Sequence, residues 1–147
     1  MRAVVTRVKN ASVVIDNETV GSINNGFLVL LGVYKDDTED IAKKIADKSC
    51  GLRIFEDADG KMNVNPSDAG AELLIVSQFT LYADCRSRRP GFTDAARPDT
   101  AIPLYELVIA ECRARGFKVE TGRFGADMQV SSVNDGPVTI ILDSKEL

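Results

Sequence analysis

Two residues with hydroxyl side chains, Ser77 and Thr80, lie in the segment Ser77-Gln78-Phe79-Thr80-Leu81, directly after a strongly apolar run. The end of a buried strand is a common place for a binding or catalytic site. Either hydroxyl could attack a carbonyl group, but each would need a neighbouring base. The alternative is that both hydroxyls hydrogen-bond locally and cap the end of the strand. Gln78 has the same local alternative, although a carboxamide in a pocket can also orient a substrate without acid–base chemistry.

Histidine is absent from the chain. This absence excludes Ser-His-Asp and Cys-His catalysis, a histidine general base and most catalytic zinc sites. The three cysteines, Cys50, Cys85 and Cys112, are far apart, odd in number and form no CxxC motif. Three free thiols are typical of a reducing compartment. We therefore expect a cytoplasmic protein whose chemistry uses no metal and no cofactor.

The segment Asn134-Asp135-Gly136-Pro137-Val138-Thr139 is a second candidate for a binding site. Asn, Asp, Gly and Pro all favour turns, so local reasoning predicts a plain turn. The functional alternative is a cis Gly136-Pro137 bond that points backbone carbonyls into a pocket, and cis bonds are rare even before proline.

Two more segments have residues that could contact a ligand. Arg86, Arg88 and Arg89 can neutralise phosphates, or they can form part of a solvated loop. The glycines of Gly122–Met128 do not match the GxGxxG pattern, so a dinucleotide site is not expected there. Phe124 and Met128 within that segment are more often core residues than the walls of a pocket.

Length and charge limit the class of protein. The chain has 147 residues, 44% of them hydrophobic, a net charge of −4 and a pI near 4.9. This length suits a single domain over residues 1–147, and so short a chain often gains by dimerising. The acidic balance argues against a general nucleic-acid coat and against DNA binding, although the arginines could hold RNA locally. Neither a signal peptide nor an apolar run of the ~18 residues that a membrane span needs is evident.

The pattern of apolar residues predicts an α+β fold. Strands are expected at Ala3–Val8, Ser12–Ile15, Thr19–Ile23, Phe27–Val33, Leu52–Phe55, within Glu72–Tyr82, at Met128–Val133 and at Val138–Leu142. Turns are expected at Lys9-Asn10, Asp16-Asn17, Asn25-Gly26, Asp59-Gly60 and Asn65–Gly70, and Asn25-Gly26 is the strongest hairpin signal.

Two helices complete the expected fold. One begins at Asp36, Asp37 or Thr38 and ends where Gly51 takes the left-handed conformation; the second begins at Asp99 or Thr100, with Pro103 in its first turn, and ends at Gly116. Because hairpins dominate, we expect antiparallel sheet curved into a barrel-like core with the two helices outside.

These segments together resemble the D-aminoacyl-tRNA deacylase family, and the resemblance runs along essentially the whole chain. It begins with Met1–Val8, continues through Leu73–Leu81 and Arg89–Phe92, and ends with Gly122–Met128 and Asn134–Thr139. The SQFTL and NDGPVT segments are each weak evidence when taken alone. Their combination at this separation, in a chain of this length without histidine, is specific.

The resemblance implies a homodimer with active sites at the subunit interface, whose substrate is the ester bond of D-aminoacyl-tRNA. Ser77 and Gln78 match residues that line the pocket. Gly136-Pro137 matches a cis bond that reaches into the partner's pocket, where its carbonyls hold the substrate's amino group and an L side chain would collide. This form of chiral proofreading accepts D-residues and also glycine, which makes glycine mischarged on tRNA-Ala a second implied substrate.

The same matching gives roles to other residues. Arg7 resembles the residue that braces the Gly-Pro motif, and Phe124 and Met128 resemble pocket or adenosine contacts. An aminoacyl ester is already activated, so the backbone N–H groups of Phe79 and Thr80 could be sufficient to stabilise the oxyanion. The resemblance suggests that the 2′-hydroxyl of the substrate's terminal adenosine assists the attacking water.

The sequence also departs from the family pattern and leaves rival hypotheses open. Gly91 stands where serine often follows Arg-Pro, and Ala83–Ser87 is not the Gly- and Lys-rich loop of the family; both departures lie outside the pocket. One rival is an esterase with Thr80 as the nucleophile. The other is a non-catalytic module that binds RNA or an amino-acid ligand, which the near absence of titratable catalytic groups favours.

Overall fold

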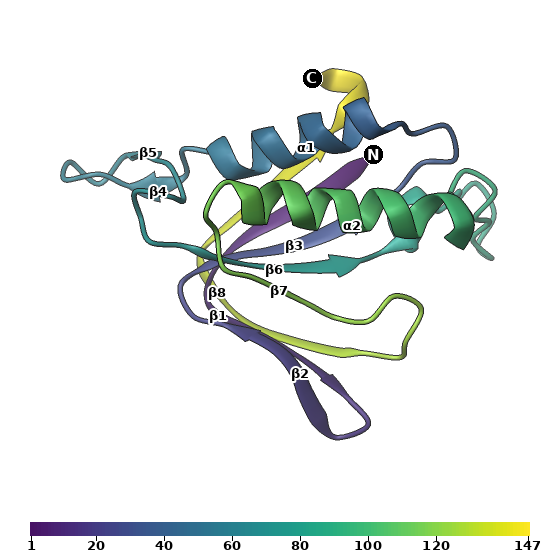
Figure 1. The fold of residues 1–147 in the computed structure, drawn as a ribbon, viewed down its shortest axis with the longest axis horizontal. Coiled ribbons are helices and arrows are strands. Elements are labelled where there is room, and N and C mark those ends of the chain that lie inside the picture. The colour runs from purple at the N-terminus through teal and green to yellow at the C-terminus, as the bar shows by residue number, and fades with distance from the viewer.

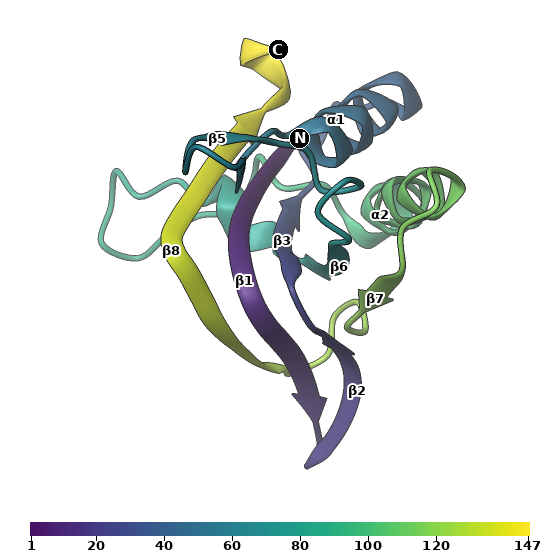
Figure 2. The ribbon, with the colours of Figure 1, turned by 90° about the vertical axis from the view of Figure 1, so that its left-hand side faces the viewer.

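The computed structural model describes all 147 residues and is built around a long, curved strand, β1 (Arg2–Ile15). Along one edge β1 pairs first with β3 (Gly26–Gly32) and then with β2 (Glu18–Ile23), and along the other edge it pairs with β8 (Gln129–Asp143). All three pairings are antiparallel. Figure 2 shows β1 and β8 curving side by side through the whole molecule.

Lys9 and Asn10 do not form the predicted turn, because β1 continues through them. Both side chains are exposed, and the pairing with β8 shifts register between Val8 and Asn10. A bulge of this kind bends a strand without ending it. The turn at Asp16-Asn17 is confirmed, since both residues have positive φ, at 50° and 64°.

The predicted hairpin at Asn25-Gly26 is also wrong. Here β2 and β3 do not pair with one another, because each pairs with a different part of β1. Gly26 is required for another reason: a Cβ atom at this position would lie 1.8 Å from the carbonyl oxygen of Glu72. Glycine therefore allows the start of β3 to contact the neighbouring strand at backbone distance.

The sheet is mixed rather than antiparallel. The strand β3 pairs in parallel with β6 (Glu72–Ser77), which in turn pairs in parallel with β7 (Val119–Thr121). The sheet curls until β7 lies against β2, where a Cβ atom on Gly21 would be 2.6 Å from the Thr121 carbonyl oxygen. The expected barrel-like curvature is thus present, and the sheet is nearly closed.

A small hairpin of β4 (Phe55–Glu56) and β5 (Met62–Val64) stands apart from the main sheet. Of the strand predicted at 52–55, only Phe55 lies in β4. The turn at Asp59-Gly60 is confirmed, with Gly60 at a φ of 74°.

The two predicted helices are present, but one end of each differs from expectation. The first, α1 (Glu39–Gly51), is capped by the Thr38 hydroxyl, which accepts a hydrogen bond from the Ile41 amide. Gly51 is the last helical residue and does not adopt a left-handed conformation, since the extended backbone of Leu52 ends the helix.

The second helix, α2 (Pro98–Ala114), begins earlier than expected, at Arg97 and Pro98. Proline suits the first helical position because no intrahelical acceptor is available for an N–H there. Asp99 and Thr100 are therefore inside the helix, and Pro103 lies beyond its first turn. Gly116 follows the helix with the expected positive φ, of 90°.

Both helices cover the same face of the sheet, as Figure 1 shows. The larger core lies between the helices and the sheet and contains Phe27, Leu31, Ile45, Leu73 and Val108 among its buried residues. A smaller core of eight buried residues, including Val8, Val13 and Leu74, lies inside the curled part of the sheet. Neither helix is long and apolar enough to cross a membrane.

Candidate active site

A pocket of about 310 Å³ lies where β6 ends, and it is bounded on the other side by the segment that follows β7. The structure thereby joins two segments that the sequence analysis treated separately. The lining consists of Val76, Ser77, Gln78, Phe79, Phe124, Gly125, Ala126, Asp127, Met128 and Val130. Phe124 and Met128, which local reasoning places in the core, are walls of this pocket.

The chain turns sharply at the pocket, from β6 into a 3-10 helix, η1 (Phe79–Tyr82). The Gln78 amide donates to the Leu31 carbonyl at 2.8 Å, which ends the parallel pairing and begins the turn. The first N–H groups of a helix have no intrahelical acceptor. The amides of Phe79 and Thr80 are in this position, and neither donates in the hydrogen bonds of the turns and caps.

Gly32 makes this turn possible, and the sequence analysis did not identify it. A Cβ atom at Gly32 would lie 2.9 Å from the Leu81 Cβ and 3.0 Å from the Gln78 carbonyl oxygen. Any larger residue would therefore push η1 away from β3. The available signal was a glycine inside the predicted central strand, where the apolar run offered no reason for one.

The side-chain hydroxyl of Thr80 is exposed and has the Gln78 carboxamide as its partner. An amide cannot act as a general base, so this contact does not activate Thr80 as a nucleophile. Asp127 is the only titratable residue that lines the pocket, and the sequence analysis gave it no role. No group of three or more His, Cys, Asp or Glu residues is arranged to hold a metal ion.

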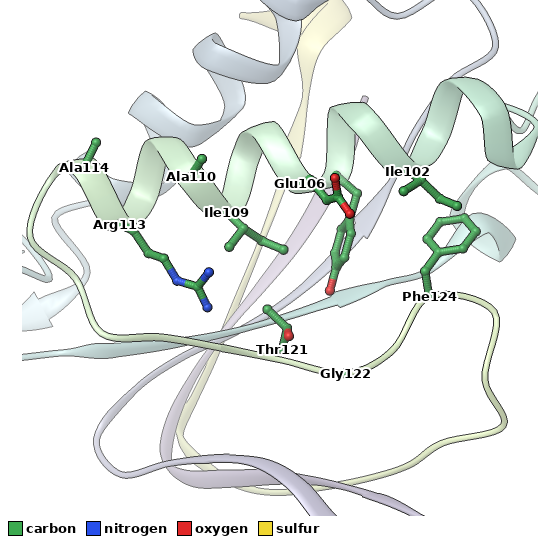
Figure 3. Close-up of a pocket in the computed structure, with 10 residues that line it drawn as sticks. Ile102, Glu106, Ile109, Ala110, Arg113, Ala114, Thr121, Gly122 and Phe124 are labelled. Carbon is green, nitrogen blue, oxygen red and sulfur yellow. The ribbon is translucent and has the colours of Figure 1, made fainter.

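A second hollow, of about 700 Å³, adjoins the pocket between α2 and the residues after β7. In Figure 3 the side chains of Ile102, Ile109 and Phe124 surround it, with Glu106 and Arg113 at its polar positions. Phe124 lines both hollows, so one aromatic ring separates them. The larger hollow meets the smaller one at Phe124, and Phe79 of η1 lines only the smaller one.

The arginine-rich segment forms a surface loop closed by paired backbone hydrogen bonds between Asp84 and Gly91, at 2.7 and 2.9 Å. Arg86 pairs with Asp84 and holds the pKa of that carboxyl at about 2. Arg88 and Arg89 are exposed and have no carboxylate partner. A Cβ atom on Gly91 would meet nothing within 4 Å, so the departure from serine there changes no packing.

The loop is tied to the pocket by two aromatic rings. Phe92 meets Phe79 edge-on, with ring centroids 5.0 Å apart. Both rings are exposed, at 37% for Phe92 and 52% for Phe79. The arginines and the pocket are thus on one connected surface of the protein.

The segment 134–139 lies inside β8, so the two strands predicted at the C-terminus are a single strand. Its pairing with β1 passes from Val8↔Asn134 to Thr6↔Thr139, which places four residues of β8 opposite Arg7 alone. The Gly136-Pro137 peptide bond within this bulge is cis, and Gly136 has a φ of 125°. The bulge does not line the pocket of its own chain.

Arg7 is buried, with only 4% of its surface exposed, and it holds the bulge in place. Its Nε donates to the Asp135 carbonyl at 3.2 Å and lies 3.4 Å from the Asp135 carboxylate. Its Nη1 donates to the Ile54 carbonyl at 2.6 Å. The guanidinium therefore connects the bulge to the segment before β4.

Comparison with known proteins agrees with this architecture. Residues 4–143 match the family described as D-Tyr-tRNA(Tyr) deacylase. A D-aminoacyl-tRNA deacylase of Thermosipho africanus is 58% identical and covers 100% of this chain and 99% of its own. One of Thermus aquaticus is also 58% identical, with coverage of 99% and 97%.

Two solved structures share the fold. One, titled c-Myc DNA Unwinding Element Binding Protein, is 38% identical with a TM-score of 0.91, over 97% of this chain and 98% of its own. The other, described as a probable eukaryotic D-amino acid tRNA deacylase, is 17% identical with a TM-score of 0.84, over 96% and 97%, and shows the fold alone. From the family match and the two full-length relatives, we conclude that the chain belongs to the D-aminoacyl-tRNA deacylase family and is a hydrolase of this kind.

Proposed function

We propose that the chain proofreads chirality by hydrolysing the ester bond of D-aminoacyl-tRNA, and that it also removes glycine mischarged on tRNA-Ala. The products are the free amino acid and the tRNA, and the reaction takes place in the cytoplasm. One observation supports this most directly: η1 begins at Phe79, which lines a pocket that lacks histidine and contains one carboxylate, and the amides of Phe79 and Thr80 are the first two of this helix. Such a site suits an activated ester and poorly suits a stable amide.

In the proposed mechanism, the amides of Phe79 and Thr80 donate to the carbonyl oxygen of the ester as negative charge develops on it. A single donor of this kind contributes roughly 10²–10³-fold to the rate in other hydrolases. Water attacks the carbonyl carbon, the bond to the ribose oxygen breaks, and that oxygen takes up a proton. The 2′-hydroxyl of the terminal adenosine assists the water, and Ser77 and Gln78 orient the aminoacyl group.

The adenosine is proposed to lie against Phe124 and Met128. Phe124 is shared by the two hollows, and its ring offers a stacking surface for the base. Beyond the adenosine, the exposed side chains of Arg88 and Arg89 are proposed to contact the tRNA backbone. The Phe79–Phe92 contact keeps that loop beside the pocket.

The chiral filter is proposed to come from a second copy of the chain. The Gly136-Pro137 bulge does not line the pocket of its own subunit, and its strand β8 is open along one edge. Val130, Val133 and Ile141 of this strand are exposed, at 39%, 50% and 69%. A homodimer formed through β8 would cover them and carry the carbonyls of the bulge to the partner's pocket.

The decisive assay compares the hydrolysis of D-Tyr-tRNA, L-Tyr-tRNA and Gly-tRNA-Ala by the purified protein. We expect rapid loss of the D and glycyl esters and persistence of the L ester. If the D ester survives at enzyme-level concentrations while the tRNA is bound, the chain is a binding module instead. Because one similar structure is titled as a DNA-binding protein, duplex DNA is added as a competitor, and we expect no inhibition.

The dimer is tested by mixing two inactive variants. Met128→Trp fills the pocket of its own subunit, and Gly136→Ala disturbs the filter that it supplies to the partner. Random exchange between them makes mixed dimers with one intact site, so roughly a quarter of all sites recover. No recovery despite proven subunit exchange would place the filter in the same chain as the pocket.

A further inference from the structure

Two cysteine side chains face one another between the helices. Cys50 lies near the end of α1 and Cys112 near the end of α2, and their Sγ atoms are 3.5 Å apart. Figure 1 shows the two helices side by side over the sheet. The thiols are buried, with exposed fractions of 8% and 1%, and they are 62 positions apart in the sequence. Spacing along the chain therefore gave no sign of the pair.

Cys50 can be reached from the solvent, whereas Cys112 cannot. Cys50 lines a surface cavity of about 260 Å³, together with Asp47 and Arg115. Cys112 does not line this cavity, and its side chain is the more deeply buried of the two, at 1% against 8% exposed. Cys50 is the only cysteine that a small oxidant entering this cavity would meet.

The surroundings also favour Cys50 as the sulfur that reacts first. Its contact with the Cys112 thiol lowers the pKa of Cys50 against the opposing effect of burial, and the Arg115 guanidinium lowers it further. The contact with Cys50 and burial both raise the pKa of Cys112. The thiolate is the reactive form of cysteine, and the Arg115 guanidinium beside the cavity favours that form at Cys50.

We propose that Cys50 and Cys112 form an oxidation site, at which a hydroperoxide converts the two thiols into a disulfide that links α1 to α2. The Cys50 sulfur attacks the peroxide oxygen, the O–O bond breaks, and sulfenic acid and water form from hydrogen peroxide. The Cys112 sulfur then attacks the Cys50 sulfur, the S–O bond breaks, and the oxygen leaves as a second water. The two thiols lose two electrons and the peroxide gains them.

The geometry requires only a short movement. A disulfide has an S–S distance of about 2.05 Å, so the sulfurs must approach by about 1.5 Å. The link would close a long loop and restrict the unfolded chain, which stabilises the folded state. This site lies on the helices, apart from the residues that line the candidate pocket, and the proposal does not depend on the deacylase mechanism.

The test uses the full chain with Cys85→Ser, which removes the exposed third thiol. Reduced protein is treated with hydrogen peroxide, unfolded, alkylated and digested with trypsin. We expect an intact mass lower by two hydrogen atoms and a linked pair of peptides, Ser49–Arg53 with Arg89–Arg113. The Tm should rise on the order of 10 °C, and a reducing agent should reverse the rise.

A second variant separates the two steps. With Cys112→Ser, peroxide should leave a sulfenic acid on Cys50 that dimedone traps, and the Tm should not rise. Wild-type protein provides the dose control, because its exposed Cys85 must oxidise. If Cys50 and Cys112 are both still alkylated after a dose that consumes Cys85, or if only disulfides between subunits form, the proposal is wrong.

Discussion

The bracing of the β8 bulge by Arg7 gives the sharpest prediction, and Arg7→Lys is the change that tests it. Lysine keeps the positive charge but loses the planar fork of the guanidinium. In the wild-type protein, two different nitrogens of the guanidinium donate hydrogen bonds, Nε to the Asp135 carbonyl at 3.2 Å and Nη1 to the Ile54 carbonyl at 2.6 Å. A single ammonium group cannot occupy both nitrogen positions, so at least one of these carbonyls loses its partner.

The cost can be worked out from the lost contact. A hydrogen bond from a charged donor contributes about 1.5–3 kcal/mol, and a buried carbonyl without a partner costs about 1–3 kcal/mol. We expect the free energy of unfolding to fall by roughly 2–4 kcal/mol, because partial rearrangement offsets part of the two terms. If about 1.4 kcal/mol of this free energy serves to hold the bulge in the conformation that rejects the L ester, the preference for the D over the L ester drops about tenfold.

Two measurements check this reasoning on the same protein. Urea unfolding gives the change in stability, and initial rates with D-Tyr-tRNA and L-Tyr-tRNA give the selectivity. Arg53→Lys is the matched control, since Arg53 forms a similar fork on Asn63 in an exposed hairpin. Loss of stability with unchanged selectivity would refute the bracing role, and an Arg7→Lys variant as stable as Arg53→Lys would refute the estimate of the buried contacts.

Three further outcomes follow from the structure. Thr80→Ala should keep activity within about tenfold of wild type, because only the backbone amide is used, and a complete loss of turnover with normal tRNA binding would instead make its hydroxyl the nucleophile. Tyr105→Phe should lower the free energy of unfolding by about 1–2 kcal/mol in urea titrations, since its buried hydroxyl donates to a carbonyl of β6 at 2.7 Å. The Asn24 amide and the Lys118 ammonium lower the pKa of Glu72, so its stabilising effect is present above the usual value of 4.5 and is lost as the pH falls through the lowered pKa. Acid should therefore destabilise wild type more than Glu72→Gln, and parallel curves of Tm against pH would contradict this.

The parts of the fold that depend on burial could be predicted from the sequence. The apolar runs at 27–33 and 73–76 are strands because both faces of the sheet are covered there. Thr38 caps a helix because its hydroxyl accepts a hydrogen bond from the amide of Ile41, three residues along the chain. An interaction between such near neighbours can be predicted from the sequence.

Other features depend on segments that are distant in the chain. Gly26 resembles a turn residue in the sequence. In the structure, glycine is needed there because the carbonyl oxygen of Glu72 leaves no room for a side chain. Lys9-Asn10 also resembles a turn, but pairing with β8 keeps it within a strand. Phe79 and Phe124 line one pocket only because the path of the sheet brings their segments together. Asp127 was overlooked because nothing in its local sequence places it in the pocket.

The open edge of β8 has a consequence for the behaviour of the isolated chain. A strand of fifteen residues that pairs on one side only is a template for the addition of further strands and for aggregation. Proline has no N–H to offer such a strand, and the bulge at Asp135–Val138 breaks the regular spacing of donors and acceptors. Pro137 thus interrupts the edge at its middle, so the residue proposed to select the substrate also protects the chain against uncontrolled polymerisation.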